Sequence, residues 1–363
     1  MPTWTGVSTL SVVLESGYQN CDIYANGQNR IAVTVSIQPT DEDAEVIWVD
    51  PGHLLSRMWL IDYVDESTLS WKSGSSWSYT DSANQFTAIP GSTDSASASA
   101  SASASASASV SEERAVVSTA ENGIQQITFY VYCGSGVANP KSIGVLVRTD
   151  TDDSVTSSLN GTFHDKVTLK PRSAVVYRRG DVSWEYARTT TKYGGNTKYV
   201  TTDAWNYYLS LDSRDNHFVT FKVWNCFSQS GYQGFFSSHI PSDNHRKNFY
   251  GGYVWNQEPH DSAYYVPSDG HSLGEVVNFP DGNKWWDYAR IYDRSYPERY
   301  LCFTWVHSTT GGDGWHLPNG PLTDWGEWYT LEIAAYDRYG NRSEFWVDGS
   351  DIIGGLNLYD TRP

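Results

Sequence analysis

The segment NGQNRIAVTVSIQPTD, at residues 26–41, decides the fold. It opens with Asn-Gly, a pair that predicts a tight turn because both residues tolerate positive φ. Apolar side chains then occupy every second position: Ile31, Val33, Val35 and Ile37. This is the period of a strand with one buried face, and we expect it to end at Pro39 and the acidic residues that follow. Because such a strand must bury its apolar face against an opposing sheet, the segment predicts a β-sandwich.

The composition favours strands along the whole chain. Aromatic residues make up 15 % of the 363 residues, with 16 Trp and 25 Tyr, whereas charged residues make up 18 %. Aromatic residues are enriched in strands, and Lys and Glu are depleted there. The length is sufficient for two or three domains, each with a substantial core. We therefore expect an all-β protein with two β-sandwich domains.

The formal net charge of −17 limits the partners of the chain. Phosphate backbones repel an acidic protein, so we expect no nucleic-acid partner. Anionic membrane surfaces are disfavoured for the same reason. No apolar run approaches the roughly 18 residues that a membrane-spanning helix requires, so we expect no membrane span.

Residues 1–16, MPTWTGVSTLSVVLES, lack the cationic start and the long apolar core of a secretory signal peptide. The lightly charged composition nevertheless suits a protein that works outside the cell or within an assembly. We expect an extracellular or surface-assembled protein that leaves the cell by lysis or a dedicated secretion machine, or whose signal has been removed. Accumulation in the cytoplasm is the alternative.

Further strands are expected in residues 7–15, 124–133, 143–149 and 163–169, the first of them pairing with the strand after the Asn-Gly turn. Residues 54–65 fit either a strand or the end of a short helix that begins at Pro51. With residues 46–50 and short strands marked by Trp71, Trp77 and Phe86, these elements give about seven to nine strands, a number typical of β-sandwiches. We place the first domain at residues 1–171.

A strict Ser-Ala alternation fills residues 95–109. One interpretation is a flexible linker, or an insertion between two strands of one sheet. The other is a paired strand, because small side chains at period two let flat sheets pack closely and join subunits. The sequence leaves both interpretations open.

The second domain, residues 172–363, is expected to be a larger β domain with long aromatic-rich loops. Strands are expected in residues 205–211, 217–224, 300–306, 328–336 and 343–348. Between residues 228 and 298 the abundance of Gly, Asn, Asp and Pro predicts long turns instead. Loops of this length are usually functional or assembly elements.

The segment at residues 26–41 resembles the opening strands of bacterial Ig-like domains, in which an Asn-Gly turn precedes an alternating Val/Thr strand. The segment AYDRYGNRSEFWVD, at residues 335–348, is similar to the closing hairpin of such domains. The two pieces cover about 30 residues. The resemblance implies the architecture of a stalk, adhesin or tail-type module, with the first domain Ig-like, and it implies no catalysis. The aromatic density, the Ser-Ala insertion and the loop-rich second half depart from that family.

The four cysteines form no CxxC pair, which argues against a zinc site built on thiolates. Two alternatives remain. One is a disulfide in each domain, Cys21–Cys133 and Cys226–Cys302, and the other is four free, half-buried thiols.

Two similar turns suggest a metal site. Residues 241–245, PSDNH, recur as PSDGH at residues 267–271. The simpler interpretation is a pair of proline-initiated turns in which Asp caps its own backbone. In the alternative, His245, Asp269 and His271 bind a divalent cation, and this mixture of ligands favours a transition metal. Otherwise no cofactor is expected.

Glu258 is the candidate for catalysis. It lies in Asn256-Gln257-Glu258-Pro259, which resembles the Asn-Glu-Pro acid/base motif of a large glycosidase clan with an extra residue inserted. Glycoside hydrolysis requires a second carboxylate about 5–10 Å away, and no spacing in the sequence identifies one. The sequence also has no nucleophile elbow, P-loop or HExxH motif.

Clustered aromatic residues are the candidates for ligand binding: Trp285, Trp286, Trp325, Trp328 and Tyr329. Because adjacent strand residues face opposite sides, one ring of each neighbouring pair belongs to the core and the other is exposed. Exposed flat rings beside polar groups suit stacking against sugars. The same rings suit protein interfaces.

The sequence thus predicts a non-enzymatic exported protein of bacterial or phage origin, such as an adhesin, lectin, tail-fibre or toxin component. We expect its second domain to bind a glycan or a protein receptor. The first alternative is a self-assembling subunit of a filament or ordered array, a homo-oligomer whose partners are further copies of the chain. The second alternative is a glycan hydrolase.

Overall fold

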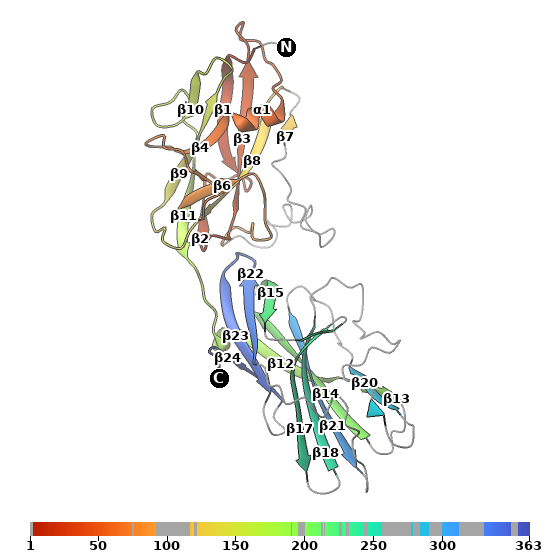
Figure 1. Cartoon of the computed structure of the whole chain (residues 1–363). Helices are drawn as coiled ribbons and strands as arrows, with labels where there is room; N and C mark the ends of the chain where they lie inside the picture. Colours follow the sequence, from red (N-terminus) through yellow and green to blue (C-terminus); the bar gives the residue numbers. More distant parts are fainter. Residues whose placement is uncertain are drawn as a thin grey trace. The chain divides into compact units, whose positions relative to one another are not determined.

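The computed structural model is nearly all β and divides into two units (Figure 1). The first unit contains Met1–Val175 together with Arg338–Asn341, and the second contains Val176–Asp337 together with Arg342–Pro363. The structure describes residues 3–74, 76–91, 117–119, 122–189, 191–194, 200–211, 213, 215–224, 227–229, 232–242, 246–255, 277–278, 284–289, 300–311, 330–349 and 355–363.

The described part of the first unit is a sandwich of two sheets. Sheet 1 has the order β1-β3-β8-β6-β5, and β7 also pairs with β8. Its strands are β1 Gly6–Leu14, β3 Ile31–Thr40, β5 Ser70–Trp71, β6 Trp77–Thr80, β7 Val117–Thr119 and β8 Gln125–Cys133. Sheet 2 has the order β10-β9-β11-β2, and β4 also pairs with β9. Its strands are β2 Asn20–Ala25, β4 Met58–Asp62, β9 Lys141–Arg148, β10 Ser154–Ser157 and β11 Val167–Ser173.

Strand β3 confirms the prediction made from its alternating pattern. It pairs with β1 on one side and with β8 on the other, both antiparallel. Its four alternating residues are all fully buried: Ile31, Val33, Val35 and Ile37. They pack in one core with residues of β8 and β9 such as Phe129 and Val145. The Asn-Gly turn that precedes β3 has Gly27 at φ +73°, and the Asn26 side-chain oxygen accepts from the amides of Gln28 and Asn29.

Pro39 does not end the strand, because β3 continues to Thr40. The pairing with β8 extends only as far as Ile37, so the missing N–H of Pro39 removes no hydrogen bond to that strand. Pro171 lies inside β11 for a similar reason: it pairs with Ile23 of β2, and the pairing of β11 with β9 ends at Leu169.

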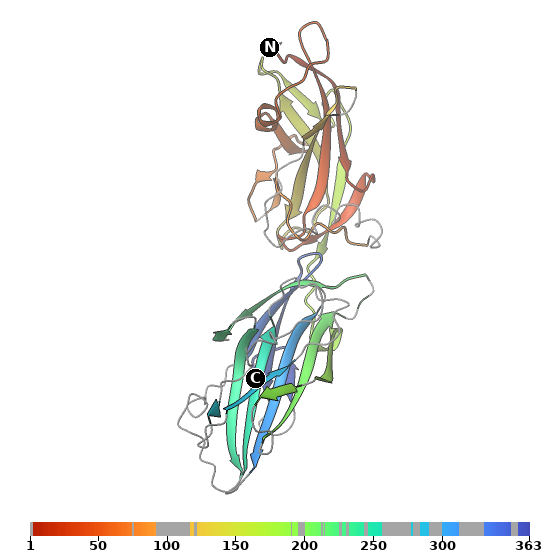
Figure 2. The ribbon, with the colours of Figure 1, turned by 90° about the vertical axis from the view of Figure 1, so that its right-hand side faces the viewer.

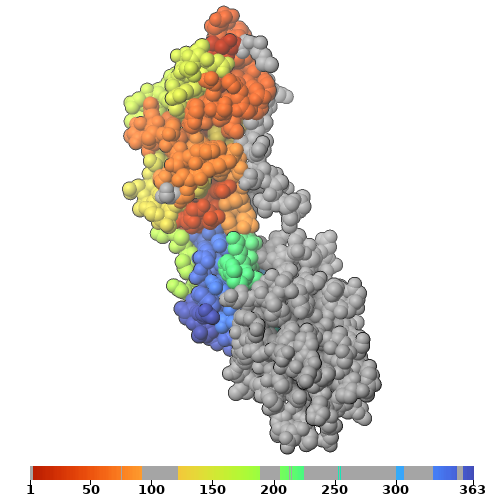
Figure 3. Space-filling view, viewed as in Figure 1, coloured from red at the N-terminus to blue at the C-terminus, as the bar shows by residue number. Residues whose placement is uncertain are grey.

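The segment after Pro51 contains both of the elements that its sequence allowed. Helix α1 spans Pro51–Ser56, and β4 follows directly. The Asp50 side chain caps the helix by accepting hydrogen bonds from the amides of Gly52 and His53. Pro51, at the first helical position, also favours a helix start here because its fixed φ suits the helix. In Figure 3 the orange atoms, which include this part of the chain, cover much of the visible face of the first unit.

Strands of the second unit form three sheets within its described residues. Sheet 3 has the order β12-β14-β21-β18-β17-β16, and its strands run side by side in Figure 2. They are β12 Val182–Thr189, β14 Val200–Leu211, β16 Phe227–Gln229, β17 Tyr232–Ser242, β18 Arg246–Trp255 and β21 Leu301–Gly311. Sheet 4 has the order β15-β22-β23-β24. Its strands are β15 Phe218–Trp224, β22 Leu331–Asp337, β23 Arg342–Gly349 and β24 Leu356–Tyr359.

Sheet 5 is smaller and has the order β13-β20-β19. Its strands are β13 Thr191–Gly194, β19 Val277–Asn278 and β20 Lys284–Ala289. Apolar residues of sheets 3 and 4 share one core, with Leu209 and Phe303 from sheet 3 and Ile333 and Phe345 from sheet 4. The second unit is therefore also layered, with its core between sheets 3 and 4.

Long turns were expected between residues 228 and 298, but strands β17 and β18 occupy residues 232–242 and 246–255 there. An irregularity between Gly234 and Phe236 and the pair Gly251-Gly252 interrupt the apolar alternation. Strand β17 nevertheless pairs with β18 along its length, and β18 also pairs with β21, so tertiary pairing overrides the local signal.

Candidate functional site

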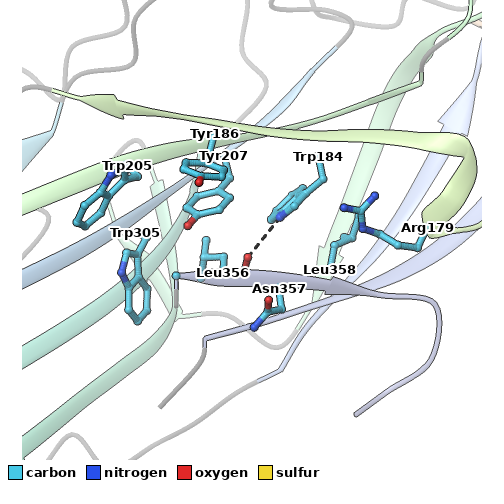
Figure 4. A pocket seen from close by; sticks show the side chains of 10 residues that line it. Arg179, Trp184, Tyr186, Trp205, Tyr207, Trp305, Leu356, Asn357 and Leu358 are labelled. Carbon is cyan, nitrogen blue, oxygen red and sulfur yellow. Dashed lines mark hydrogen bonds between the residues drawn. The ribbon is translucent and has the colours of Figure 1, made fainter. Parts of the chain in front are cut away.

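The second unit contains a pocket of about 500 Å³ between one face of sheet 3 and the edge strand β24 (Figure 4). Five aromatic side chains line it: Trp184, Tyr186, Trp205, Tyr207 and Trp305. The remaining lining residues are Arg179, Gly355, Leu356, Asn357 and Leu358. The walls thus come from four segments that are far apart in the sequence.

Strand geometry gathers the aromatic rings on one face. Trp184 and Tyr186 are two residues apart on β12, as Trp205 and Tyr207 are on β14, and side chains at this spacing share a face. Antiparallel pairing then places Tyr186 opposite Tyr207, and Trp205 opposite Trp305 on β21. The result is a continuous aromatic surface across three adjacent strands.

The rings of the pocket range from exposed to fully buried. Tyr186 is 66 % exposed, and its ring stacks on Tyr207 with a centroid distance of 5.3 Å. Trp184 contacts the ring of Tyr207 at 5.4 Å and is half-buried. Tyr207 and Trp305 are buried, at 6 % and 2 % exposed. A ligand would therefore meet a partly exposed rim at Tyr186 and a packed floor at Trp305.

Strand β24 approaches the aromatic face very closely. The indole nitrogen of Trp184 donates to the carbonyl oxygen of Leu356 at 3.3 Å, the dashed line in Figure 4. Burial raises the pKa of the Tyr207 phenol, and a backbone hydrogen bond from Leu356 opposes that rise. Gly355 has φ +81°, and a Cβ placed on it would lie 1.9 Å from the Tyr207 hydroxyl oxygen. Only glycine fits at this position without displacing the phenol.

Two polar side chains complete the pocket. Asn357 is exposed on β24, and Arg179 is half-buried in the 3₁₀ helix η1, Arg179–Asp181. None of the ten described lining residues carries a carboxylate, an imidazole or a thiol. The described lining offers ring faces, two phenol hydroxyls, an amide and a guanidinium, which are groups that suit the binding of a ligand.

Several of the residues predicted from sequence lie outside the described part of the chain: His245, Glu258, Asp269, His271, Trp325, Trp328 and Tyr329. Trp285 and Trp286 lie on β20, where their backbones pair with Val277 and Gly194. Their side chains are also outside the described set. Within the described residues, no group of three His, Cys, Asp or Glu side chains is placed to hold a metal ion.

The described cysteines are thiols. Cys21 on β2 and Cys133 at the end of β8 are both free, so of the two alternatives for this pair the structure has free thiols and not a Cys21–Cys133 disulfide. Burial raises the pKa of each to about 12, with the neighbouring charge of Asp22 adding to the rise at Cys21. The Cys302 thiol donates to the carbonyl oxygen of Phe303 at 3.7 Å, and Cys226 lies outside the described residues.

The five aromatic residues of the pocket were not among the candidates chosen from sequence. Their signal is the spacing of aromatic residues in three short segments: WEY at 184–186, WNY at 205–207 and FTW at 303–305. Rings two residues apart share a strand face, so each segment predicts a pair of rings on one side. Which segments are neighbours, and hence that the pairs form one surface, follows only from the order of sheet 3.

Within the described residues, no helix is long and apolar enough to cross a membrane. A comparison with models of known protein families gives no match to the chain, and a search of curated proteins gives none either.

Proposed function

We propose that the chain is a non-enzymatic, exported binding or structural protein of bacterial or phage origin, such as an adhesin, lectin, tail-fibre or toxin component. Its second unit binds a glycan in the pocket formed by sheet 3 and β24. The observation that carries this proposal is the surface of five aromatic side chains lining that pocket.

The chemistry of the lining supports a sugar more than a purely apolar ligand. The C–H groups on a pyranose face pack on flat aromatic rings, and its hydroxyl groups require hydrogen-bond partners at the ring edge. Asn357 and Arg179 supply an amide and a guanidinium beside the aromatic surface. The volume of about 500 Å³ falls in the range of small-ligand pockets, roughly 300–1,000 Å³.

Binding is favoured over hydrolysis by the same lining. A glycosidase of the usual kind holds two carboxylates on either side of the scissile bond. The described lining residues include no Asp or Glu. We therefore place glycan hydrolysis behind glycan binding as an explanation of this pocket.

Glycan-array binding by the full chain tests the proposal, followed by titration of a bound glycan with the Trp205→Ala variant. Trp205 is half-buried, and it lines the pocket on β14. Because a stacked ring contributes about 0.5–1.5 kcal/mol beyond the area that it buries, we expect affinity to fall by about tenfold or more.

Trp224→Ala is the matched control. Trp224 lies in the second unit on β15, is 41 % exposed and does not line the pocket. We expect this variant to bind like the unchanged protein. The absence of any glycan ligand on the array, or equal affinity of the Trp205→Ala variant and the unchanged protein, would contradict the proposal.

A further inference from the structure

The pocket has a cationic group at one end, the Arg179 guanidinium, which forms no ion pair with the described residues. The guanidinium of Arg179 donates through Nη1 to the carbonyl oxygen of Val182 at 3.4 Å. No carboxylate of the described residues lies within 4.0 Å of its nitrogen atoms. A guanidinium has five N–H donors, so most of those on Arg179 remain available to a ligand.

Two carboxylates lie close to the backbone of Arg179, and each accepts a hydrogen bond from a backbone amide. Asp181 accepts from the amide of Arg178 at 2.8 Å. Asp360 accepts from the amide of Arg179 itself. These contacts fix the backbone around Arg179 while leaving its side chain free of an ion pair within the described structure.

The position of Arg179 relative to the rings is what a charged sugar requires. Figure 4 shows Trp205 and Trp305 at one end of the pocket, Tyr186 and Tyr207 in the middle, and Trp184 followed by Arg179 at the other end. The half-buried guanidinium thus lies at the end of an aromatic surface, where partial exclusion of water strengthens a charge–charge contact.

We propose that the pocket selects acidic sugars, such as uronic or sialic acids, and that the sugar carboxylate pairs with Arg179. This inference rests on the proposed glycan-binding function of the same pocket. A guanidinium binds a carboxylate through two parallel N–H···O bonds, and a lysine ammonium cannot reproduce that geometry. The acidic sugar lies at the Trp184 end, and the next sugar unit extends over Tyr207 toward Trp205.

The net charge of the whole chain limits the kind of acidic glycan. At −17 the protein repels long polyanions, but at physiological ionic strength this repulsion is screened beyond about 8 Å. Contact with Arg179 occurs well within that distance. We therefore expect short acidic oligosaccharides, or the ends of longer ones, to be the preferred ligands.

Matched pairs of glycans test the inference by calorimetric titration of the full chain. The pairs are oligogalacturonate with its methyl ester, and sialyllactose with lactose, so that within each pair one member lacks the negative charge. We expect at least one acidic member to bind roughly ten- to a hundredfold more tightly than its neutral partner, as a charge-assisted hydrogen bond provides. The Arg179→Ala variant should lose that preference, and Arg179→Lys should retain only part of it.

Arg178→Ala is the matched control, because Arg178 is exposed, carries the same charge and does not line the pocket. It should retain the preference for the acidic partner. Circular dichroism of each variant verifies that the strands are intact, and the Arg179→Lys variant keeps the test decisive if Arg179→Ala does not fold.

The two proposals fail in different ways. If neutral and acidic partners bind equally and Trp205→Ala still weakens binding, the acidic-sugar inference is overturned and the glycan pocket stands. The inference is also overturned if the acidic preference survives in Arg179→Ala. If no member of any pair binds while the array yields a neutral glycan ligand, the acidic-sugar inference is overturned, and if the array yields no ligand, the glycan-binding function itself fails.

Discussion

Replacing Gly355 by Ala probes the closest approach in the pocket, between β24 and the aromatic face. Gly355 has φ +81°, a region that L-residues adopt at a cost of roughly 1–2 kcal/mol. Its added Cβ would lie 1.9 Å from the Tyr207 hydroxyl oxygen and 3.0 Å from the carbon that carries it. Either the buried phenol or the start of β24 must therefore move.

The expected cost combines the two effects. Overpacking in a well-packed site costs about 1–3 kcal/mol. Together with the backbone term, Gly355→Ala should lower the free energy of unfolding of the second unit by roughly 2–5 kcal/mol. Gly17→Ala separates the terms, because Gly17 has φ +74° but no atom within 4 Å of the position that a Cβ would take there. That variant should lose only about 1–2 kcal/mol in the first unit.

Chemical denaturation of both variants, monitored by tryptophan fluorescence and circular dichroism, measures these costs. The change in unfolding free energy of each variant is taken from the unfolding transition of the unit that carries the substitution. A double-mutant cycle with Tyr207→Phe then isolates the clash, because this change removes the hydroxyl oxygen nearest to the new methyl group. We expect a favourable coupling of about 1 kcal/mol or more between the two substitutions. The Cζ atom at 3.0 Å keeps the rescue incomplete.

Two results would refute this reasoning. The first is a loss in Gly355→Ala no larger than that in Gly17→Ala. The second is a coupling of zero with Tyr207→Phe. Either would mean that a side chain at position 355 is accommodated without pressing on Tyr207.

The remaining predictions concern the first unit. The hydrogen bond from His53 to Asp150, 2.7 Å long, lowers the pKa of the Asp150 carboxyl. The stabilisation from this contact is therefore fully present above the ordinary aspartate pKa of about 3.9, and it is lost as pH falls through the lowered pKa of Asp150 in the folded protein. Between about pH 4 and pH 2, the free energy of unfolding of Asp150→Asn should therefore fall less than that of the unchanged protein. The same fall in both proteins would contradict the role of this contact. Burial raises the pKa of Cys133 to about 12, so a thiol reagent at about pH 8 should modify Cys133 only after denaturation, and rapid labelling of the folded protein, located by peptide mapping, would show that the site opens.

Local patterns in the sequence predicted many of the strands. The alternation in β3 identified a strand and its buried face, and β1 was correctly expected to pair with it. The pattern failed where the partner strand matters more than the residue itself. Pro39 and Pro171 lie inside strands, at positions past the end of the pairing of β3 with β8 and of β11 with β9. Strands β17 and β18 lack a clean alternation. They form because they pair with each other and β18 also pairs with β21.

The aromatic residues of the pocket are not the ones that were chosen from the sequence. Binding through aromatic rings of the second domain was expected, and Trp285 and Trp325 were chosen because they lie in clusters of aromatic and polar residues at turn-like positions. The rings of the pocket are instead two residues apart on their strands, as with Trp205 and Tyr207, and this spacing puts both on one face.

By itself the sequence determined the fold class, the faces of its regular strands and the thiol-poor, acidic character of the chain, because alternation, composition and charge are properties of neighbouring residues. Apart from the pairing of β1 with β3, only the tertiary structure decided which strands are neighbours. Residues 184, 205, 305 and 356 meet at one pocket because β12, β14 and β21 pair in one sheet and β24 closes over it. Pairing between segments so distant along the chain depends on the packing of the whole unit, and no local pattern contains that information.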